Sequence, residues 1–229
     1  MRTYRLAWIG LIATLAFGAP ARAGDATLVP PPALDDARAP GVAAPQTVVL
    51  AGGCCWGVQA GFQHVKGVSQ ALSGYAGGSR DTAQYEAVST GRTGHAESVA
   101  VTFDPAVVSF GTILRVFFSV AHNPTEKDRQ GPDVGPQYRS AIFVKDAEQR
   151  RIAERYVAQL DKAGTFRRPI VTEINDLHGF YPAEAYHQDY VTTHPNNPYI
   201  AYNDLPKLAS LKQLFPELYD LDPVLVARR

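Results

Sequence analysis

The chain has 229 residues, with 22 Lys and Arg balanced by 22 Asp and Glu, so its formal net charge is zero at pH 7. This balance gives no indication of a nucleic-acid partner or an anionic membrane surface, because such partners select proteins with a basic excess. The chain is long enough for one globular domain with a proper hydrophobic core.

The N-terminus has the pattern of a signal peptide. A basic start, Met1 to Arg5, precedes an uncharged segment from Leu6 to Phe17 and the triplet Ala21-Arg22-Ala23. The apolar segment is too short to span a membrane, and the triplet fits an A-x-A cleavage site. We therefore predict a signal peptide over 1–23 and an exported, periplasmic protein with no membrane insertion after the signal is removed.

Residues 24–46 are rich in Pro and Ala and show no apolar periodicity. This composition predicts an extended, weakly ordered tether. Residues 47–222 contain no internal repeat and no second linker, and we expect them to form a single globular domain.

The first element of this domain is an apolar run, Thr47 to Leu50, followed by Ala51-Gly52-Gly53-Cys54-Cys55-Trp56-Gly57. Val58, Phe62 and Val65 then follow helical spacing, so the pattern is that of a strand, a glycine turn and a helix. Cys54 would lie in the first turn of that helix, where free N–H groups favour an ionised thiol. The alternative is that Cys54 is a small buried filler, as many free cysteines are.

The two cysteines of the chain are adjacent, which makes a structural disulfide between them a poor expectation. Their Cα atoms lie about 3.8 Å apart, whereas disulfides usually span about 4.4–6.8 Å. On a helix, neighbouring side chains also point in different directions. A strained, transient bond remains open.

A strand is predicted at 67–72, and a second one at 97–103 carries the most informative alternation. Val99, Val101 and Phe103 share one face of that strand with Glu97. Burial at the end of an apolar face would favour the protonated carboxyl and suit Glu97 to donate a proton near neutral pH. The alternative is that Glu97 turns towards solvent.

The second half of the domain adds further helices and strands. The spacing of apolar residues predicts helices over 110–121, 146–160 and 205–215, strands over 141–144 and 170–174, and a long polar loop over 122–140. We expect the aromatic clusters near 180–190 and 199–202 to wrap around the core. This order of elements fits an α+β fold better than a doubly wound parallel sheet.

These pieces together resemble an A-type peptide methionine sulfoxide reductase over residues 47–215. The resemblance rests on four linked motifs: Gly53-Cys54-Cys55-Trp56-Gly57, Gly74-Tyr75-Ala76-Gly77-Gly78, Gly91-Arg92-Thr93-Gly94-His95-Ala96-Glu97, and Gln130-Gly131-Pro132-Asp133 with Gln137-Tyr138-Arg139-Ser140. Each motif alone is weak, but their shared order and spacing are highly specific. The resemblance implies a two-layer α/β sandwich with a mixed sheet, a core related to the ferredoxin plait and a wrapped C-terminal tail.

The resemblance also implies an activity, the thiol-dependent reduction of methionine S-sulfoxide, free or protein-bound, without a metal or cofactor. Cys54 matches the nucleophile that attacks the sulfur, Glu97 the proton donor, and Trp56 a wall of the pocket for the substrate methyl group. Hydrogen bonds to the sulfoxide oxygen or to a water beside it are implied for Tyr85, Asp133 and Tyr138. The product on the enzyme would be a Cys54 sulfenic acid, to be reduced by a thioredoxin-like dithiol protein.

The chain departs from the family pattern at three places. Cys55 replaces a pocket Phe, Gln59 replaces a Glu that we interpret as a surface detail, and no resolving cysteine follows Cys55. Cys54 would then be regenerated either by direct attack of the external dithiol or through a strained bond to Cys55. Two other functions remain open: a non-catalytic vicinal-thiol module for a soft metal ion, and a degenerate, inactive reductase.

Overall fold

The computed structural model describes residues 26–36 and 44–228. The predicted signal peptide lies outside the described residues, so export remains a prediction. The strands are β1 (Gln46–Gly52), β2 (Val68–Ala76), β3 (Ala96–Phe103), β4 (Arg129–Gln130), β5 (Asp133–Val134), β6 (Ser140–Val144), β7 (Glu173–Asp176) and β8 (Phe180–Pro182). The α-helices are α1 (Cys55–Gln63), α2 (Tyr85–Val88), α3 (Phe110–Val116), α4 (Ala147–Lys162), α5 (Tyr190–Thr193) and α6 (Leu205–Leu214).

Six of the strands form one mixed sheet in the order β7-β6-β1-β3-β2-β8. Every neighbouring pair is antiparallel except β6 and β7, which are parallel. β1 lies near the centre, where Leu50 is paired with Val99 on one side and with Ile142 on the other. The predicted α+β class with a mixed sheet is confirmed.

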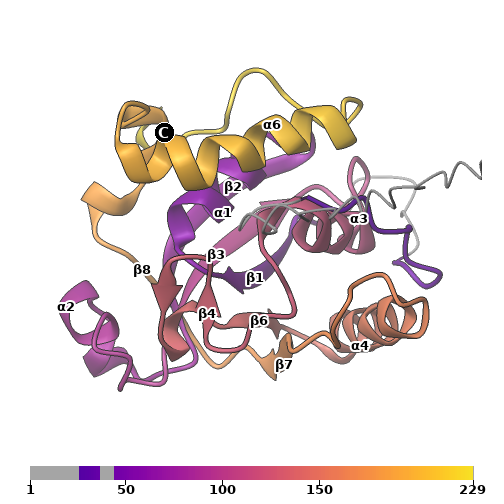
Figure 1. Ribbon diagram of the computed structural model, residues 1–229, viewed down its shortest axis with the longest axis horizontal. Coiled ribbons are helices and arrows are strands. Elements are labelled where there is room, and N and C mark those ends of the chain that lie inside the picture. Colours follow the sequence, from indigo (N-terminus) through magenta and orange to yellow (C-terminus); the bar gives the residue numbers. More distant parts are fainter. Residues whose placement is uncertain (1–25, 37–43, 229) are drawn as a thin grey trace, which may run out of the picture.

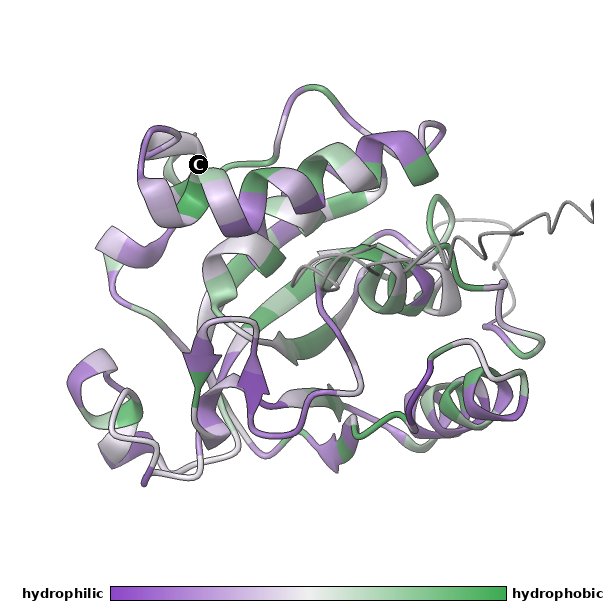
Figure 2. Ribbon diagram, in the orientation of Figure 1, coloured by the Kyte–Doolittle hydropathy of each residue, from purple (hydrophilic) through white to green (hydrophobic). Residues whose placement is uncertain are grey.

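One face of this sheet carries the main hydrophobic core. Val48 and Leu50 of β1 and Val99 and Val101 of β3 pack there against the apolar sides of α1, α3 and α4. The opposite face is lined by smaller residues, mainly alanines of β1, β2, β3 and β6. The hydrophobic residues are concentrated in these central strands and on the inner sides of the helices (Figure 2).

The predicted helices and strands are present, with shifted ends. Asp146 caps α4 by accepting a hydrogen bond from the N–H of Gln149 at 2.8 Å, as its position three residues before an amide predicts. The helix α3 continues as a π-helical turn over Phe117–Ala121. The strand predicted at 170–174 begins only at Glu173, because the N–H of Val171 donates to the carbonyl of Pro124.

The C-terminal tail wraps over α1, as predicted. Figure 1 shows α6 running beside α1, and Ile200 and Val191 of the tail pack against Ala60. Farther on, Asp189 accepts hydrogen bonds from the N–H groups of Val226 and Ala227. Among the described residues, no helix is long and apolar enough to cross a membrane.

The expectation of a weakly ordered tether is wrong for residues 26–36. Val29 is fully buried in the main core, and its N–H donates to the hydroxyl of Ser119 at 3.2 Å. Arg115 donates to the Val29 carbonyl at 3.0 Å and Tyr156 to the Pro30 carbonyl at 2.6 Å. Proline favours an extended backbone and has no N–H group that needs a partner. Residues of α3 and α4 bind the carbonyls of the segment, which a free tether would leave to solvent.

We predict that Val29→Ala destabilises the fold by about 1–2 kcal/mol, because it removes two buried methyl groups. Leu28→Ala is the matched control, since the Leu28 side chain is 50% exposed and its loss should change the free energy of unfolding by less than about 0.5 kcal/mol. Urea denaturation measures both. Equal effects of the two substitutions would show that this segment does not stabilise the domain.

Candidate active site

The site is built on the junction between β1 and α1. β1 ends at Gly52, and Gly53 follows with a φ of +92°, a conformation that glycine adopts without strain. A Cβ atom at Gly53 would also lie 2.6 Å from the Gln130 side chain. Cys54 is the N-cap of α1 and is half-buried, whereas Cys55 is buried in the main core. The two thiols therefore differ in their exposure to solvent.

Glu97, at the start of β3, is only 5% exposed. One of its carboxylate oxygens accepts a hydrogen bond from the N–H of Cys55 at 3.1 Å. Burial raises the pKa of Glu97 from 4.5 to about 7, although the N–H and thiol of Cys55 act in the opposite direction. The alternative that Glu97 turns towards solvent is therefore wrong, and its carboxyl is about half protonated at neutral pH.

The expectation that Cys54 ionises more readily than a free thiol is wrong for this arrangement. Interaction with the Cys55 thiol, burial and the negative charge of Glu97 raise the pKa of Cys54 well above its usual value. The N-terminus of α1 does not offset these effects, because its first N–H already donates to Glu97. The resting thiol is therefore neutral.

The other sequence-predicted polar residues lie within electrostatic reach of Cys54 and Glu97. Burial and, after it, the charge of Glu97 raise the pKa values of Tyr85 and Tyr138, so both hydroxyls remain proton donors at neutral pH. Asp133 accepts a hydrogen bond from the Tyr199 hydroxyl. The structure thus brings all five candidate polar residues together.

Trp56 lies in an aromatic cluster contributed by the C-terminal tail. Its ring stacks on Tyr190 with 3.8 Å between centroids and meets Tyr199 edge-on at 6.0 Å. Its indole N–H donates to Nδ1 of His187 at 3.0 Å. The sequence placed these tail residues over the core but did not assign them to the site. In the sequence, the only pattern that could have indicated their role in the site was the clustering of aromatic residues in the tail.

A buried ion pair lies next to Gly57 of α1. Asp204 is fully buried and lies 3.2 Å from Nζ of Lys207. A Cβ atom at Gly57 would lie only 2.1 Å from Oδ1 of Asp204, so this glycine is required by close approach. Burial raises the pKa of Asp204. Sequence reasoning missed the pair, because Asp204 and Gly57 are far apart in the chain.

Gln59, interpreted from the sequence as a surface detail, is buried. Its amide nitrogen donates to the Ala71 carbonyl at 3.1 Å and to Gln188 at 2.7 Å. Its amide oxygen accepts from the N–H of Asp189 at 2.9 Å. Gln59 therefore joins α1, β2 and the tail segment that carries His187 and Tyr190.

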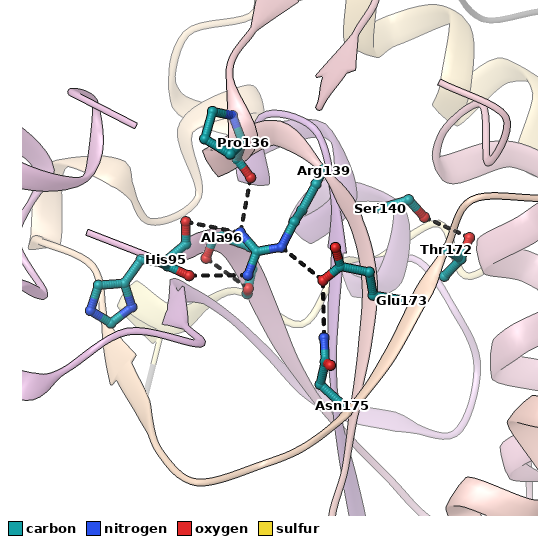
Figure 3. A network of polar contacts seen from close by, with 10 residues as sticks. His95, Ala96, Pro136, Arg139, Ser140, Thr172, Glu173 and Asn175 are labelled. Carbon is teal, nitrogen blue, oxygen red and sulfur yellow. Dashed lines mark hydrogen bonds and ion pairs between the residues drawn. The ribbon is translucent and has the colours of Figure 1, made fainter. Parts of the chain in front are cut away.

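Arg139 joins the loop before β3, which leads to Glu97, to the turn at Pro136, which leads to Tyr138. Figure 3 shows its bonds to the His95 and Pro136 carbonyls. Its guanidinium donates to the carbonyls of Gly94, His95 and Pro136 at 2.9–3.3 Å and pairs with Glu173 at 3.1 Å. A planar guanidinium can satisfy several acceptors at fixed angles. These bonds hold the start of β3 against the segment that ends at Tyr138.

A groove of about 560 Å³ leads away from Cys54. Its walls come from the N-terminal segment, the end of the π-helical turn, the β4–β5 hairpin, the segment after α4 and the C-terminal tail. It is lined by Ala26, Thr27, Cys54, Phe118, Ser119, Val120, His122, Asn123, Thr125, Gln130, Gly131, Pro132, Asp133, Thr165, Phe166, Arg167, Arg168, Tyr199, Asn203 and Lys207. In the part of the chain that the structure describes, no group of three or more His, Cys, Asp or Glu side chains could hold a metal ion.

Comparison with known proteins agrees with this arrangement. Residues 46–218 match the family model described as peptide methionine sulfoxide reductase. The chain belongs to this family. It is an enzyme of the MsrA type, with methionine sulfoxide reductase A activity, and the interpretation as a non-catalytic thiol module is overturned.

Relatives of this reductase cover most of its length. It is 60% identical over 193 residues to peptide methionine sulfoxide reductase MsrA 2 of Mesorhizobium japonicum, a match that covers 84% of this chain and 97% of the relative. The protein of the same name from Synechocystis is 49% identical, over 75% of this chain and 80% of the relative.

Solved structures support the same family. Methionine sulfoxide reductase A of Corynebacterium diphtheriae has a TM-score of 0.58 and 36% identity, over 69% of this chain and 78% of that chain. Mxr1 from Saccharomyces cerevisiae in reduced form has a TM-score of 0.59 and 30% identity, over 67% and 87%. The α+β fold with its mixed six-stranded sheet is therefore that of known MsrA structures.

The raised pKa of Glu97 predicts a specific pH dependence of stability. Between the unfolded value of 4.5 and the folded value of about 7, the folded protein binds more protons than the unfolded chain, so stability falls as the pH rises. The Gln side chain of the variant Glu97→Gln cannot titrate. Its free energy of unfolding, relative to that of the wild type, should therefore rise by about 3 kcal/mol from pH 4 to pH 8.

Urea denaturation of both proteins across this pH range measures the difference, in which the contributions of the other titratable groups cancel. Parallel stability curves would show that the Glu97 pKa is not raised.

Proposed function

We propose that this reductase acts on the S epimer of methionine sulfoxide, with Cys54 as the nucleophile and Glu97 as the proton donor. The observation that carries the proposal is the buried Glu97 carboxyl, with a pKa of about 7, hydrogen-bonded to the residue after Cys54. A sulfoxide sulfur becomes electrophilic when its oxygen is protonated. A carboxyl that is half protonated at neutral pH suits this step.

The reaction balances without a cofactor. Sγ of Cys54 forms a bond to the substrate sulfur while Glu97 gives its proton to the sulfoxide oxygen. Transfer of the oxygen to Cys54 releases the thioether and leaves a sulfenic acid, so sulfur of the substrate is reduced and sulfur of the enzyme is oxidised. The proton lost by the Cys54 thiol replaces the one that Glu97 donated.

The neighbouring residues have supporting roles in this proposal. Tyr85 and Tyr138 donate hydrogen bonds to the sulfoxide oxygen, because both hydroxyls are protonated and lie near Glu97. Asp133 positions that oxygen or a water beside it, and is itself held by Tyr199. The Trp56 ring, fixed by its stack on Tyr190 and its bond to His187, forms an apolar wall for the substrate methyl group.

An external dithiol protein of the thioredoxin-like type completes the cycle by attacking the Cys54 sulfenic acid directly. Cys55 is less suited to this step, because it is only 3% exposed and its thiol packs in the core next to Glu97. A bond between adjacent cysteines would also strain the peptide or the first turn of α1. Oxidation by sulfoxide without reductant should therefore retain one oxygen and one free thiol by intact mass and thiol titration. Loss of both thiols with no retained oxygen would support the Cys55 route.

Replacement of the two principal residues should abolish or strongly reduce activity. With dithiothreitol and a dabsyl-labelled methionine S-sulfoxide, Cys54→Ser should form no methionine, and Glu97→Gln should lower kcat/KM by about 10²–10⁴, the usual contribution of a general acid.

Cys55→Ser is the control for the adjacent thiol and should retain activity with dithiothreitol. Circular dichroism and urea denaturation confirm that each variant is folded. An inactive wild-type protein would indicate a degenerate reductase, and an active Cys54→Ser variant would contradict the assignment of the nucleophile.

A further inference from the structure

The groove that begins at Cys54 is larger than the reaction requires. Of the residues proposed to act in the reaction, Cys54 and Asp133 line the groove, whereas Glu97 and Trp56 lie outside its lining. The groove extends from there over residues 118–123 and along the segment 165–168 that follows α4, with a total volume of about 560 Å³. Volumes of this size accommodate ligands much larger than one side chain.

The charge along the groove is predominantly positive. Arg167, Arg168 and Lys207 line it, whereas Asp133 is its single acidic lining residue among those described. Burial, together with Lys207, lowers the pKa of the lining residue His122 to about 3, so this imidazole is neutral and adds no charge at physiological pH.

The two arginines are available to a ligand. Both side chains belong to exposed residues, and neither forms an ion pair or hydrogen bond with any of the residues that the structure describes. Lys207, in contrast, is already paired with Asp204. Unpaired guanidinium groups are well suited to bind carboxylates in two-point contacts.

We propose that this groove binds the polypeptide that flanks an oxidised methionine, and that Arg167 and Arg168 select acidic side chains in it. The inference rests on the proposed attack by Cys54, because the flanking residues can lie in the groove only if the sulfoxide is bound at that thiol. It names the substrate class as methionine sulfoxide in acidic polypeptide segments. Free methionine sulfoxide would leave most of the groove empty.

Peptide kinetics with the full chain test this inference. Peptides of equal length with one central methionine S-sulfoxide carry either three Asp or three Lys residues on one flank, and kcat/KM is measured with dithiothreitol. When the charged residues lie on the flank that enters the groove, we expect kcat/KM at low salt to be about three- to tenfold higher for the Asp peptides than for the Lys peptides. One or two partly exposed ion pairs give a preference of this size. The preference should shrink at 0.5 M NaCl because of screening.

The variant Arg167→Gln/Arg168→Gln should reduce this preference to about one, while its kcat/KM for N-acetyl-methionine S-sulfoxide remains that of wild type. The matched control is Lys145→Gln/Arg155→Gln, which removes the same charge from exposed positions outside the groove. It should keep the preference.

Three outcomes would overturn the inference. One is equal turnover of Asp and Lys peptides by the wild-type protein on both flanks, and another is an unchanged preference in the Arg167/Arg168 variant. The third is a variant that is slowed only with a protein dithiol as reductant, which would make the groove a docking surface for that partner. Failure of the wild type on the small substrate would instead contradict the proposed attack by Cys54, so the two failures are distinguishable.

Discussion

The hydrogen bond from the Cys55 N–H to Glu97 is the interaction on which the site depends. It joins the first turn of α1 to the start of β3, and thus links the segment that carries the nucleophile to the one that carries the acid. Because the bond lies where the sheet meets the helical layer, Glu97 is removed from water and its pKa rises. The same bond occupies the N–H that could have stabilised a Cys54 thiolate. The resting site therefore holds a neutral thiol next to a carboxyl that is about half protonated at neutral pH.

The surrounding structure holds this junction in place from several directions. Arg139 fixes the loop before β3 through the carbonyls of Gly94 and His95, and Gln59 fixes the tail through Gln188 and Asp189. Asp204 packs against Gly57, where no larger residue fits. These contacts join segments more than 40 residues apart, so the site exists only when the whole domain is folded. The tail is therefore part of the active site as well as a cover for the core.

Local pattern predicted much of the fold and part of the site. The strand and helix around Cys54, the capped α4 and the shared face of Glu97 and Val99 all follow from periodicity over a few residues. The pattern could not reveal the contacts of Tyr199, Asp204 or Gln59, because each partner lies far away in the sequence. The segment 26–36 was misjudged for a similar reason: its proline-rich composition matches a tether, and partners far away in the sequence, such as Ser119, Arg115 and Tyr156, turn it into part of the core. The Cys54 pKa was misjudged because the helix terminus was considered without the Cys55 thiol, the burial of Cys54 and the charge of Glu97.

The proposed mechanism depends most on the protonation state of Glu97. A ¹³C NMR titration of the protein labelled at the glutamate side-chain carboxyl carbon, with the Glu97 resonance assigned by its absence in Glu97→Gln, measures that state directly. We predict a titration midpoint near 7, because burial raises the pKa of Glu97 to about 7. A midpoint close to the ordinary glutamate value of about 4.3 would mean that Glu97 is ionised at neutral pH, and would contradict its role as the proton donor.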